Sequence, residues 1–384
     1  MPRSLAAALL AAALLLTSAP VASAVPPPPA EDSFYVPPAG FEQAAPGTVL
    51  RQRSVTVTGL GIPIPVRSTQ FLVRSTDAHD RPVAVVSTLM VPLTPYPGVR
   101  PLLSYQQAID SLGDQCNPSY TLRTGMMQEL ALLAQGLMRG WAVVTTDFQG
   151  PRNAYGAGRM AGHAVLDGVR AARAVVGDVP VGLWGYSGGG QATAWAAELA
   201  PSYAPELPIV GAAEGGVPAD LTSVIKKVDG TVFSGVVFAA VFATSREYPE
   251  LAGLLNADGR ATASRIADMC QAEVAVALAG RRLSEFTVSA DPLAEPVAQS
   301  VLADNALGGQ VPSTPVFLFH AYFDELIPVD VGRQLKADYC AGGARVQYYE
   351  DYVTEHIGLD IAAAPLAVAY LADRFAGRPA PSSC

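Results

Sequence analysis

Short runs of apolar residues alternate along the chain with longer stretches in which apolar residues recur every three or four positions. The short runs are rich in Val, Leu and Phe, a composition typical of parallel strands that are buried on both faces. The longer stretches have the spacing of helices with one apolar face. This alternation predicts a mostly parallel sheet with crossover helices. The predicted strands are Val83–Leu89, Pro101–Tyr105, Ala142–Thr146, Val181–Gly185, Ile209–Ala212, Val316–His320 and Val346–Tyr349.

Two of the predicted helices lie between these strands. The first ends before Gly140, and the second runs from Met160 to Val176 and ends before Gly177 and Pro180, which are residues that stop helices. Their apolar side chains are predicted to belong to the core rather than to contact a cofactor. In the first helix these are Met127, Leu130, Leu133, Ala134 and Leu137.

The N-terminus has the layout of a signal peptide. Arg3 precedes an apolar run from Leu5 to Leu16, which is too short to span a bilayer, and the small residues at 22–24 suit cleavage. We therefore expect a mature chain that begins at Val25, keeps no membrane anchor, and is exported to the medium or the cell envelope. The proline-rich segment 25–29 predicts an extended spacer or a strap on the surface.

Composition limits the class of protein. The chain has 384 residues, half of them apolar, which allows one large core with an inserted subdomain. Removal of residues 1–24 takes away one arginine and no acidic residue, so the net charge falls from −9 to −10. Such a chain is not expected to seek nucleic acid or anionic membranes through its overall charge.

The cysteines predict disulfides rather than a metal site. Their number is even, no Cys-x-x-Cys spacing occurs, and the chain is predicted to be exported to an oxidising compartment. Four cysteines allow three pairings, among which spacing alone does not choose. They are Cys116, Cys270, Cys340 and Cys384.

The segment Gly185-Tyr186-Ser187-Gly188-Gly189 has the pattern of a nucleophile elbow, because it follows an apolar strand and opens a helix predicted to end near Ala200, before Pro201. A turn this tight needs glycine at 185 and 189. It would expose Ser187 beside helix N–H groups that can stabilise an oxyanion. A chain with 35 glycines can contain this pattern by chance, but the flanking strand and helix favour an α/β-hydrolase fold with a catalytic serine.

A serine nucleophile needs a histidine base, and this fold places the acid and then the histidine after the serine in the chain. His79 and His163 precede Ser187 and are excluded by that order. His320 lies within a predicted strand, before the best acid candidate. His356 remains, in a loop after the last predicted strand.

The acid is expected in a loop after a strand between the serine and the histidine. Asp324 meets this condition and would accept the Nδ1 proton of His356. Glu325 is its nearest competitor. Asp330 is interpreted as the cap of a helix that begins near Val331.

Several further segments give the chain a specific resemblance to the secretory lipase family, which includes the fungal lipase A enzymes. The resemblance covers nearly the whole mature chain. The matching segments are Asp32-Ser33-Phe34-Tyr35, Tyr105-Gln106 with Asp110, Cys116-Asn117-Pro118-Ser119-Tyr120, Asp147-Phe148-Gln149-Gly150-Pro151, Val165-Leu166-Asp167-Gly168-Val169-Arg170-Ala171, the elbow, Gly215-Gly216-Val217-Pro218-Ala219-Asp220-Leu221, and the regions around Asp324 and His356.

The resemblance implies a triad of Ser187, Asp324 and His356, with Asp110 and the backbone N–H of Gly188 forming the oxyanion hole. It also implies triacylglycerol lipase or carboxylesterase activity without a cofactor or a metal. The implied disulfides join Cys116 to Cys270 and Cys340 to Cys384. The chain departs from the family at Ala108, because members can have an aromatic residue two positions before the oxyanion aspartate.

The segment 217–310, between the strands near Ile209 and Val316, is far longer than a usual crossover and is predicted to form a helical cap. We expect the hydrolase core to comprise 25–216 and 311–384. Phe238 and Phe242 lie in an apolar stretch of the cap that is too short to span a membrane. This stretch is either a buried cap helix or a lid that contacts lipid transiently, and both Phe side chains are expected to bind substrate.

These observations together predict a secreted enzyme that hydrolyses acyl esters, such as triacylglycerols, through an acyl-enzyme. Two alternatives stay open. One is another reaction on the same triad, either acyl transfer to an alcohol or peptide hydrolysis. The other is a cell-surface binding protein that keeps the fold without catalysis.

Overall fold

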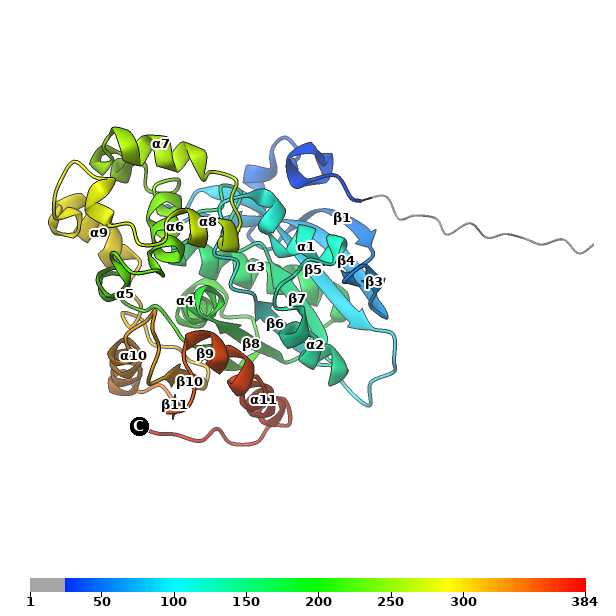
Figure 1. Ribbon diagram of the computed structural model, residues 1–384. Helices are drawn as coiled ribbons and strands as arrows, with labels where there is room; N and C mark the ends of the chain where they lie inside the picture. Colours follow the sequence, from blue (N-terminus) through cyan, green and yellow to red (C-terminus); the bar gives the residue numbers. More distant parts are fainter. Residues whose placement is uncertain (1–24) are drawn as a thin grey trace, which may run out of the picture.

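The seven predicted strands all form and lie side by side in one sheet. A computed structural model describes residues 25–384, so the predicted signal peptide lies outside the described residues (Figure 1). Each strand starts and ends within three residues of its predicted bounds. They are β5 (Pro82–Pro92), β6 (Leu102–Gln106), β7 (Ala142–Thr146), β8 (Val181–Tyr186), β9 (Ile209–Gly215), β10 (Val316–Ala321) and β11 (Val346–Asp351).

The pattern of apolar runs did not indicate two further strands, β1 (Val49–Val55) and β4 (Val66–Thr76). They complete a nine-stranded sheet with the order β1-β4-β5-β7-β6-β8-β9-β10-β11. In this order the last six strands, β7-β6-β8-β9-β10-β11, pair in parallel. The first three, β1-β4-β5, pair antiparallel with one another, and β5 also pairs antiparallel with β7. β1 is partly exposed and carries Arg51 and Arg53, so it lacks the continuous apolar run of a buried strand. The prediction of a mostly parallel sheet is confirmed.

Helices cover both faces of the sheet and enclose two apolar cores. α3 (Gly158–Val176), α4 (Gly188–Tyr203) and α10 (Val329–Ala341) pack on one face. The other face carries α1 (Pro118–Thr124), α2 (Leu130–Met138) and α11 (His356–Phe375). Helices on both faces leave the carboxyl ends of the parallel strands as the free edge where loops can carry chemistry.

Two predicted helix ends are wrong. Pro201 does not stop α4, which continues to Tyr203 with the proline in its last turn, because the fixed φ of proline is helical and only one N–H bond is lost. Asp330 is not the cap of α10. The helix begins at Val329 after Pro328, and Asp330 lies in its first turn, where its carboxylate accepts a bond of 2.9 Å from Arg333.

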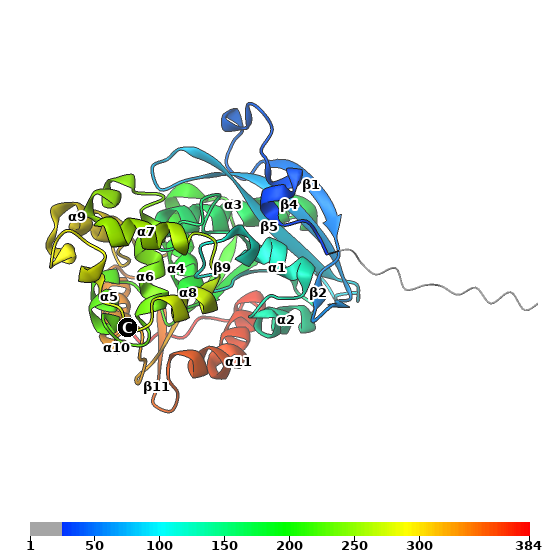
Figure 2. The same cartoon turned by 45° about the horizontal axis from the view of Figure 1, so that its top comes forward.

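The connection between β9 and β10 forms a cap built from helices. In two views of the molecule these helices stay together on one side of the sheet (Figures 1 and 2). The exact domain boundaries at 217 and 310 stay a prediction. The cap helices are α5 (Leu221–Val228), α6 (Ser234–Thr244), α7 (Ala257–Arg265), α8 (Gln271–Ala277) and α9 (Pro296–Asp304).

Two disulfides tie distant segments together. Cys116 bonds Cys270 and Cys340 bonds Cys384, which are the pairs that the family resemblance implies. The first joins the segment before α1 to the cap, and the second joins α10 to the C-terminal tail. They span 154 and 44 residues, so in the chain-entropy account they restrict the unfolded chain by roughly 5 and roughly 4 kcal/mol.

Among residues 25–384, α11 is the one helix that is long and apolar enough to cross a membrane by length and composition. Its most apolar window is 44% buried within the protein. The helix packs against β8, β9 and β10 through residues such as Leu359, Ala364 and Leu371. These contacts identify α11 as a core helix of the sheet.

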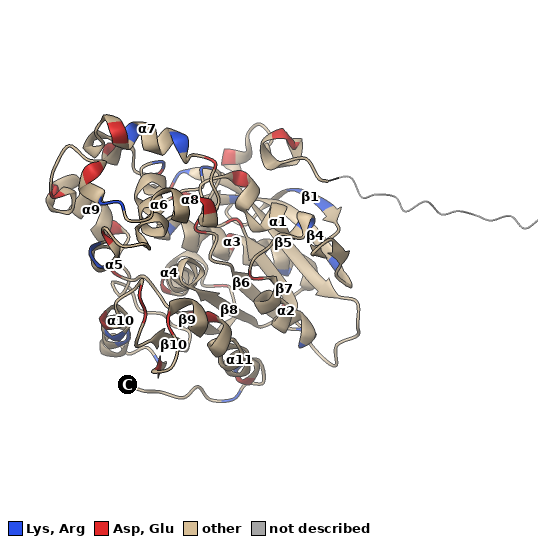
Figure 3. Ribbon diagram, in the orientation of Figure 1, with Lys and Arg blue, Asp and Glu red and all other residues tan. Residues whose placement is uncertain are grey.

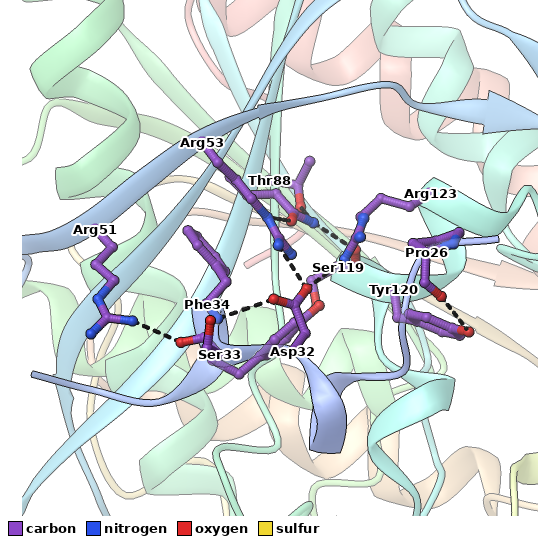
Figure 4. Close-up of polar contacts among 12 residues, drawn as sticks. Pro26, Asp32, Ser33, Phe34, Arg51, Arg53, Thr88, Ser119, Tyr120 and Arg123 are labelled. Carbon is purple, nitrogen blue, oxygen red and sulfur yellow. Dashed lines mark hydrogen bonds and ion pairs between the residues drawn. The ribbon is translucent and has the colours of Figure 1, made fainter. Parts of the chain in front are cut away.

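The segment after the predicted cleavage site lies as a strap against β1 and α1 and is anchored by Asp32 (Figure 4). The Asp32 carboxylate pairs with Arg53 of β1 at 2.6 Å and with Arg123 of α1 at 3.2 Å. It also accepts the Phe34 N–H at 3.0 Å. Burial alone raises the pKa of Asp32, but the bonds from Arg53, Phe34 and Arg123 outweigh it, so the pKa lies below its ordinary value.

We predict that Asp32→Asn lowers the melting temperature by about 2–4 °C near neutral pH, because both arginines lose their carboxylate partner. The pKa of Asp32 is lower in the folded state than in the unfolded state. Its stabilisation is therefore complete above the unfolded pKa and disappears as the pH falls through the folded pKa. Thermal melts across this range should show the gap from wild type closing on acidification, whereas Glu31→Gln, at an exposed neighbour, should leave the melts unchanged. A gap that persists at low pH would contradict this account.

Candidate active site

The turn between β8 and α4 holds Ser187 in a conformation that L-residues rarely adopt, with φ of 54° and ψ of −120°. The Ser187 N–H donates to the Gly215 carbonyl at 2.9 Å, which fixes the turn to β9. A Cβ at Gly185 would lie 2.2 Å from the Gly189 carbonyl oxygen, and one at Gly189 would lie 2.0 Å from that of Gln106. The two glycines are therefore required because backbone occupies the space that a side chain would need.

Ser187, His356 and Asp324 form a continuous hydrogen-bonded chain at the carboxyl edge of the sheet. His356 Nε2 lies 2.9 Å from Ser187 Oγ, and its Nδ1 lies 2.6 Å from Asp324 Oδ2. Each residue stands just after a parallel strand: the serine after β8, the aspartate after β10 and the histidine after β11. Parallel strands bring these three loops to one edge, so residues 169 positions apart meet.

The loop after β10 distinguishes Asp324 from its competitor Glu325. The second oxygen of Asp324 accepts the N–H groups of Leu326 and Ile327 at 2.9 and 2.7 Å. Burial raises the pKa of Asp324, but these bonds and His356 outweigh it, and the pKa falls below its ordinary value. Glu325 instead accepts the backbone N–H of His356 at 3.0 Å. Asp324 thus faces the imidazole ring, whereas Glu325 holds the start of α11.

The histidine is buried and oriented from both sides. Its backbone carbonyl accepts the Tyr186 hydroxyl at 2.6 Å, and only 3% of the residue is exposed. Burial lowers the pKa of His356, but the bond and charge of Asp324 outweigh it and raise the pKa above its ordinary value. The two histidines that precede Ser187 in the chain lie in different surroundings. His79 is hydrogen-bonded to the Glu247 carbonyl, and the ring of His163 packs at a tilt against Tyr203.

His320 is a contact of the site that sequence reasoning missed. It is fully buried within β10, and its Nε2 lies 3.4 Å from Asp324 Oδ2 and 3.2 Å from the Ile327 carbonyl oxygen. The ring that lies within hydrogen-bond distance of Ser187 Oγ is that of His356, not that of His320. The sequence did carry a signal for this contact, because His320 lies only four residues before Asp324 in the same strand-to-loop segment.

Asp110 lies beside the elbow in a strained conformation with φ of 44°. A Cβ on Gly188 would lie 1.9 Å from Asp110 Oδ1, so the carboxyl group packs directly on that glycine. Burial raises the pKa of Asp110 to about 7, although His356 and Gln271 act in the opposite direction. The loop is supported from behind by Glu129, which accepts the Ala108 N–H at 3.0 Å.

Phe238 and Phe242 lie inside the cap rather than on its surface. They are 0% and 4% exposed, and both pack edge-on against Phe286. α6 carries no charged residue and appears in tan, whereas the outer helix α7 carries both signs (Figure 3). Of the two interpretations of this stretch, the structure therefore agrees with a buried cap helix. Whether these side chains bind substrate stays a prediction.

A neighbouring face of α6 lines a small apolar cavity of about 80 Å³. Val237, Val241 and Thr244 face it from α6, opposite leucines of the surrounding cap segments. Leu221 and Ile225 of α5 line it where the chain leaves β9. The residues that line this cavity all belong to the cap, and Ser187, His356 and Asp110 are not among them.

The site brings together a hydroxyl, an imidazole, an ionised carboxylate and N–H donors at a helix start, which is the set needed for acyl transfer through a serine. Within residues 25–384, no three His, Cys, Asp or Glu side chains are grouped so as to hold a metal ion.

The family model for secretory lipases matches residues 116–383. The chain belongs to the secretory lipase family. Among curated relatives, the Probable inactive lipase MT1628 of Mycobacterium tuberculosis is 40% identical over 369 residues, which cover 91% of this chain and 83% of the relative. Lipase 4 of Candida albicans is 34% identical over 382 residues, 92% of this chain and 83% of the relative.

Solved structures show that this chain has the α/β-hydrolase fold. Candida antarctica lipase A aligns with a TM-score of 0.87 at 30% identity, over 94% of this chain and 89% of that one. The rice cell wall degrading esterase LipA of Xanthomonas oryzae aligns with a TM-score of 0.71 at 17% identity, over 86% of this chain and 100% of that one. The second likeness bears on the fold alone.

We predict that Gly189→Ala destabilises this secretory lipase by at least about 3 kcal/mol or prevents folding, because the new methyl group would meet the Gln106 carbonyl. Gly253→Ala is the matched control, since a Cβ there would meet nothing within 4 Å. Chemical denaturation of both variants measures the difference. Equal stability of the two variants would show that the backbone of the elbow can shift to accommodate a methyl group at position 189.

Proposed function

We propose that this secretory lipase hydrolyses acyl esters through a covalent acyl-enzyme on Ser187. The observation that carries the proposal is the unbroken contact from Ser187 Oγ through the His356 ring to Asp324, at 2.9 and 2.6 Å. A serine is a weak nucleophile on its own, and a base within hydrogen-bond reach gives it the reactivity that ester cleavage needs.

In the first half-reaction His356 Nε2 takes the Ser187 proton while Oγ attacks the ester carbonyl carbon. The carbonyl oxygen becomes an oxyanion. When this intermediate collapses, the bond to the alcohol breaks, His356 protonates the leaving alkoxide, and the acyl group remains on Oγ. In the second half-reaction His356 takes a proton from water, the hydroxide attacks the acyl carbon, and Oγ leaves and recovers the proton.

Asp324 serves this cycle by keeping the Nδ1–H of His356 pointed toward it, so that Nε2 faces the serine with a free lone pair. The low pKa of Asp324 keeps it ionised as the imidazolium forms. The ion pair stabilises the charged ring during each transfer.

The oxyanion hole is formed in this proposal by the Gly188 N–H and the Asp110 side chain. Gly188 opens α4, so its N–H lies at the positive end of the helix dipole. A carboxylate would repel the oxyanion, but a neutral carboxyl group can donate an O–H bond. The pKa of about 7 allows Asp110 to be neutral in the free enzyme at and below neutral pH.

The proposed substrates are triacylglycerols and related long-chain esters. The apolar cavity beneath α6 offers room for part of an acyl chain, and each buried methylene contributes about 0.8 kcal/mol to its binding. Phe238 and Phe242 support one wall of the cap helix that lines this cavity. We propose that they shape the acyl site and that any contact with a lipid surface is made through the cap.

A second candidate is a catalytically silent protein of the same fold, which is favoured by the name of the mycobacterial relative. A fluorescent alkyl phosphonate distinguishes the two, because it labels only a serine that its base activates. Labelling at Ser187 together with release of fatty acid supports the enzyme. An unlabelled, folded protein supports the silent role. The alternative reactions would use the same triad. Transfer of the acyl group to an added alcohol would show a different acceptor, and cleavage of a peptide would show a different substrate.

We predict that Ser187→Ala lowers kcat for a short soluble ester by a factor on the order of 10⁶, and Asp324→Asn by about 10⁴, because the triad works as a unit. Glu325→Gln is the matched control and should cost far less, since it removes a contact to the His356 backbone rather than to the ring. Melting curves verify folding. Greater loss in the Glu325 variant would move the acid to that residue.

We predict a bell-shaped pH profile of kcat/KM. Activity falls at acid pH because the ring of His356, whose pKa is raised, becomes protonated. It falls again above about pH 7 because Asp110 ionises and loses its donor proton. Asp110→Asn keeps a donor that does not ionise, so it should retain part of the rate and lose the alkaline limb, whereas Asp110→Ala should lose about 10²-fold in rate. An unchanged alkaline limb in the Asn variant would remove Asp110 from the oxyanion hole.

A further inference from the structure

The cap touches the oxyanion loop directly through the segment that starts α8. The Leu112 N–H donates to the Met269 carbonyl at 2.9 Å, and the Gln271 N–H donates to Ser111 Oγ at 2.9 Å. The Gln271 side chain reaches further, and its Nε2 donates to Asp110 Oδ2 at 3.2 Å. Residues 160 positions apart in the chain thus meet at the site of the proposed oxyanion hole.

We propose that Gln271 is a positioning residue, which fixes which oxygen of Asp110 carries the proton and so makes the cap part of the oxyanion hole. The proposal rests on the proposed function, because it needs Asp110 to act as an oxyanion donor. Gln271 itself is not expected to touch the reacting atoms.

The argument follows from the two oxygens of a neutral carboxyl group. One is a carbonyl oxygen that accepts hydrogen bonds, and the other carries the proton and donates. An amide N–H that points at Oδ2 needs an acceptor there, which leaves the proton on Oδ1. Oδ1 packs on Gly188 and has no hydrogen-bond partner among the described residues. The buried oxygen that carries the proton is therefore the one beside the elbow, where the oxyanion of the intermediate would form.

Several groups face Asp110 from different elements and set its charge. The ring of His356 and the Gln271 amide favour the carboxylate, and burial favours the neutral acid more strongly. Tyr155 also acts to lower the pKa of Asp110, and the charge of Asp110 contributes to the raised pKa of the buried Glu129. Removal of Gln271 takes away one interaction that lowers the pKa of Asp110. The pKa should therefore rise while the proton loses its fixed position.

Further contacts hold the seam between the cap and the oxyanion loop, where residues 269–271 meet residues 110–112. The Cys116–Cys270 disulfide lies next to Gln271 in the chain. Arg246 bridges the same seam, donating to the Leu112 carbonyl at 2.7 Å and to the Ala267 carbonyl at 2.8 Å. These contacts hold the start of α8 beside Asp110.

The test compares Gln271→Leu with Gln115→Leu in the mature chain. Leucine fills a similar volume without a donor. Gln115 is the matched control because its Nε2 crosses the same seam to the Asp268 carbonyl and does not contact Asp110. Both variants are assayed on a short soluble ester across pH, with melting curves to verify folding.

We expect Gln271→Leu to lower kcat at least about tenfold with little change in KM, and to move the alkaline limb to higher pH, while Gln115→Leu behaves as wild type. Equal losses in both variants would reduce Gln271 to a packing contact, and an unchanged rate and limb would overturn the proposal. Asp110→Asn, measured alongside, separates the two failures. If Asp110→Asn keeps the alkaline limb of wild type, the proposed oxyanion hole is wrong. If Asp110→Asn loses that limb but Gln271→Leu leaves both rate and limb unchanged, only the positioning role is wrong.

Discussion

The close approach of three backbone segments at the end of β8 is the constraint on which the site depends. The helix α4 can start directly after Ser187 only because the glycines at 185 and 189 leave room for neighbouring carbonyl groups. This approach sets the φ of Ser187 and aims its side chain at His356. It also brings the loop after β6 against Gly188, so that the same close packing positions Ser187 and Asp110.

Two buried aspartates near the site have pKa values that are shifted in opposite directions, for physical reasons. Asp324 accepts two backbone N–H groups and faces His356, so its pKa is held low. Asp110 is buried at least as deeply but has weaker compensation, and its pKa rises to about 7. Carboxyl groups in different surroundings can thus take different roles, one as a fixed anion and one as a neutral donor.

The cap combines an apolar interior with polar anchors. Phe238, Phe242 and Phe286 form its centre, and a cavity lies on a neighbouring face of α6. At its border with the core, Glu247 is fully buried and pairs with Arg152, while Gln271 contacts Asp110. A buried charge is costly unless it is paired, so these contacts favour one docked position of the cap border.

The sequence by itself determined the elements of the parallel sheet, the elbow and the order of the three triad candidates, because buried strands, tight turns and chain order leave local signals. It predicted Asp324 as the acid with Glu325 as its nearest competitor, because adjacent carboxylates in one loop are hard to distinguish until the backbone direction is known. Only the tertiary structure decided that Asp324 faces the ring, that His320 lies against it, and that Gln271 reaches Asp110. It also revealed β1 and β4, whose polar residues conceal their pairing. These contacts join segments remote in the chain or depend on side-chain direction, and no periodicity along the sequence encodes either.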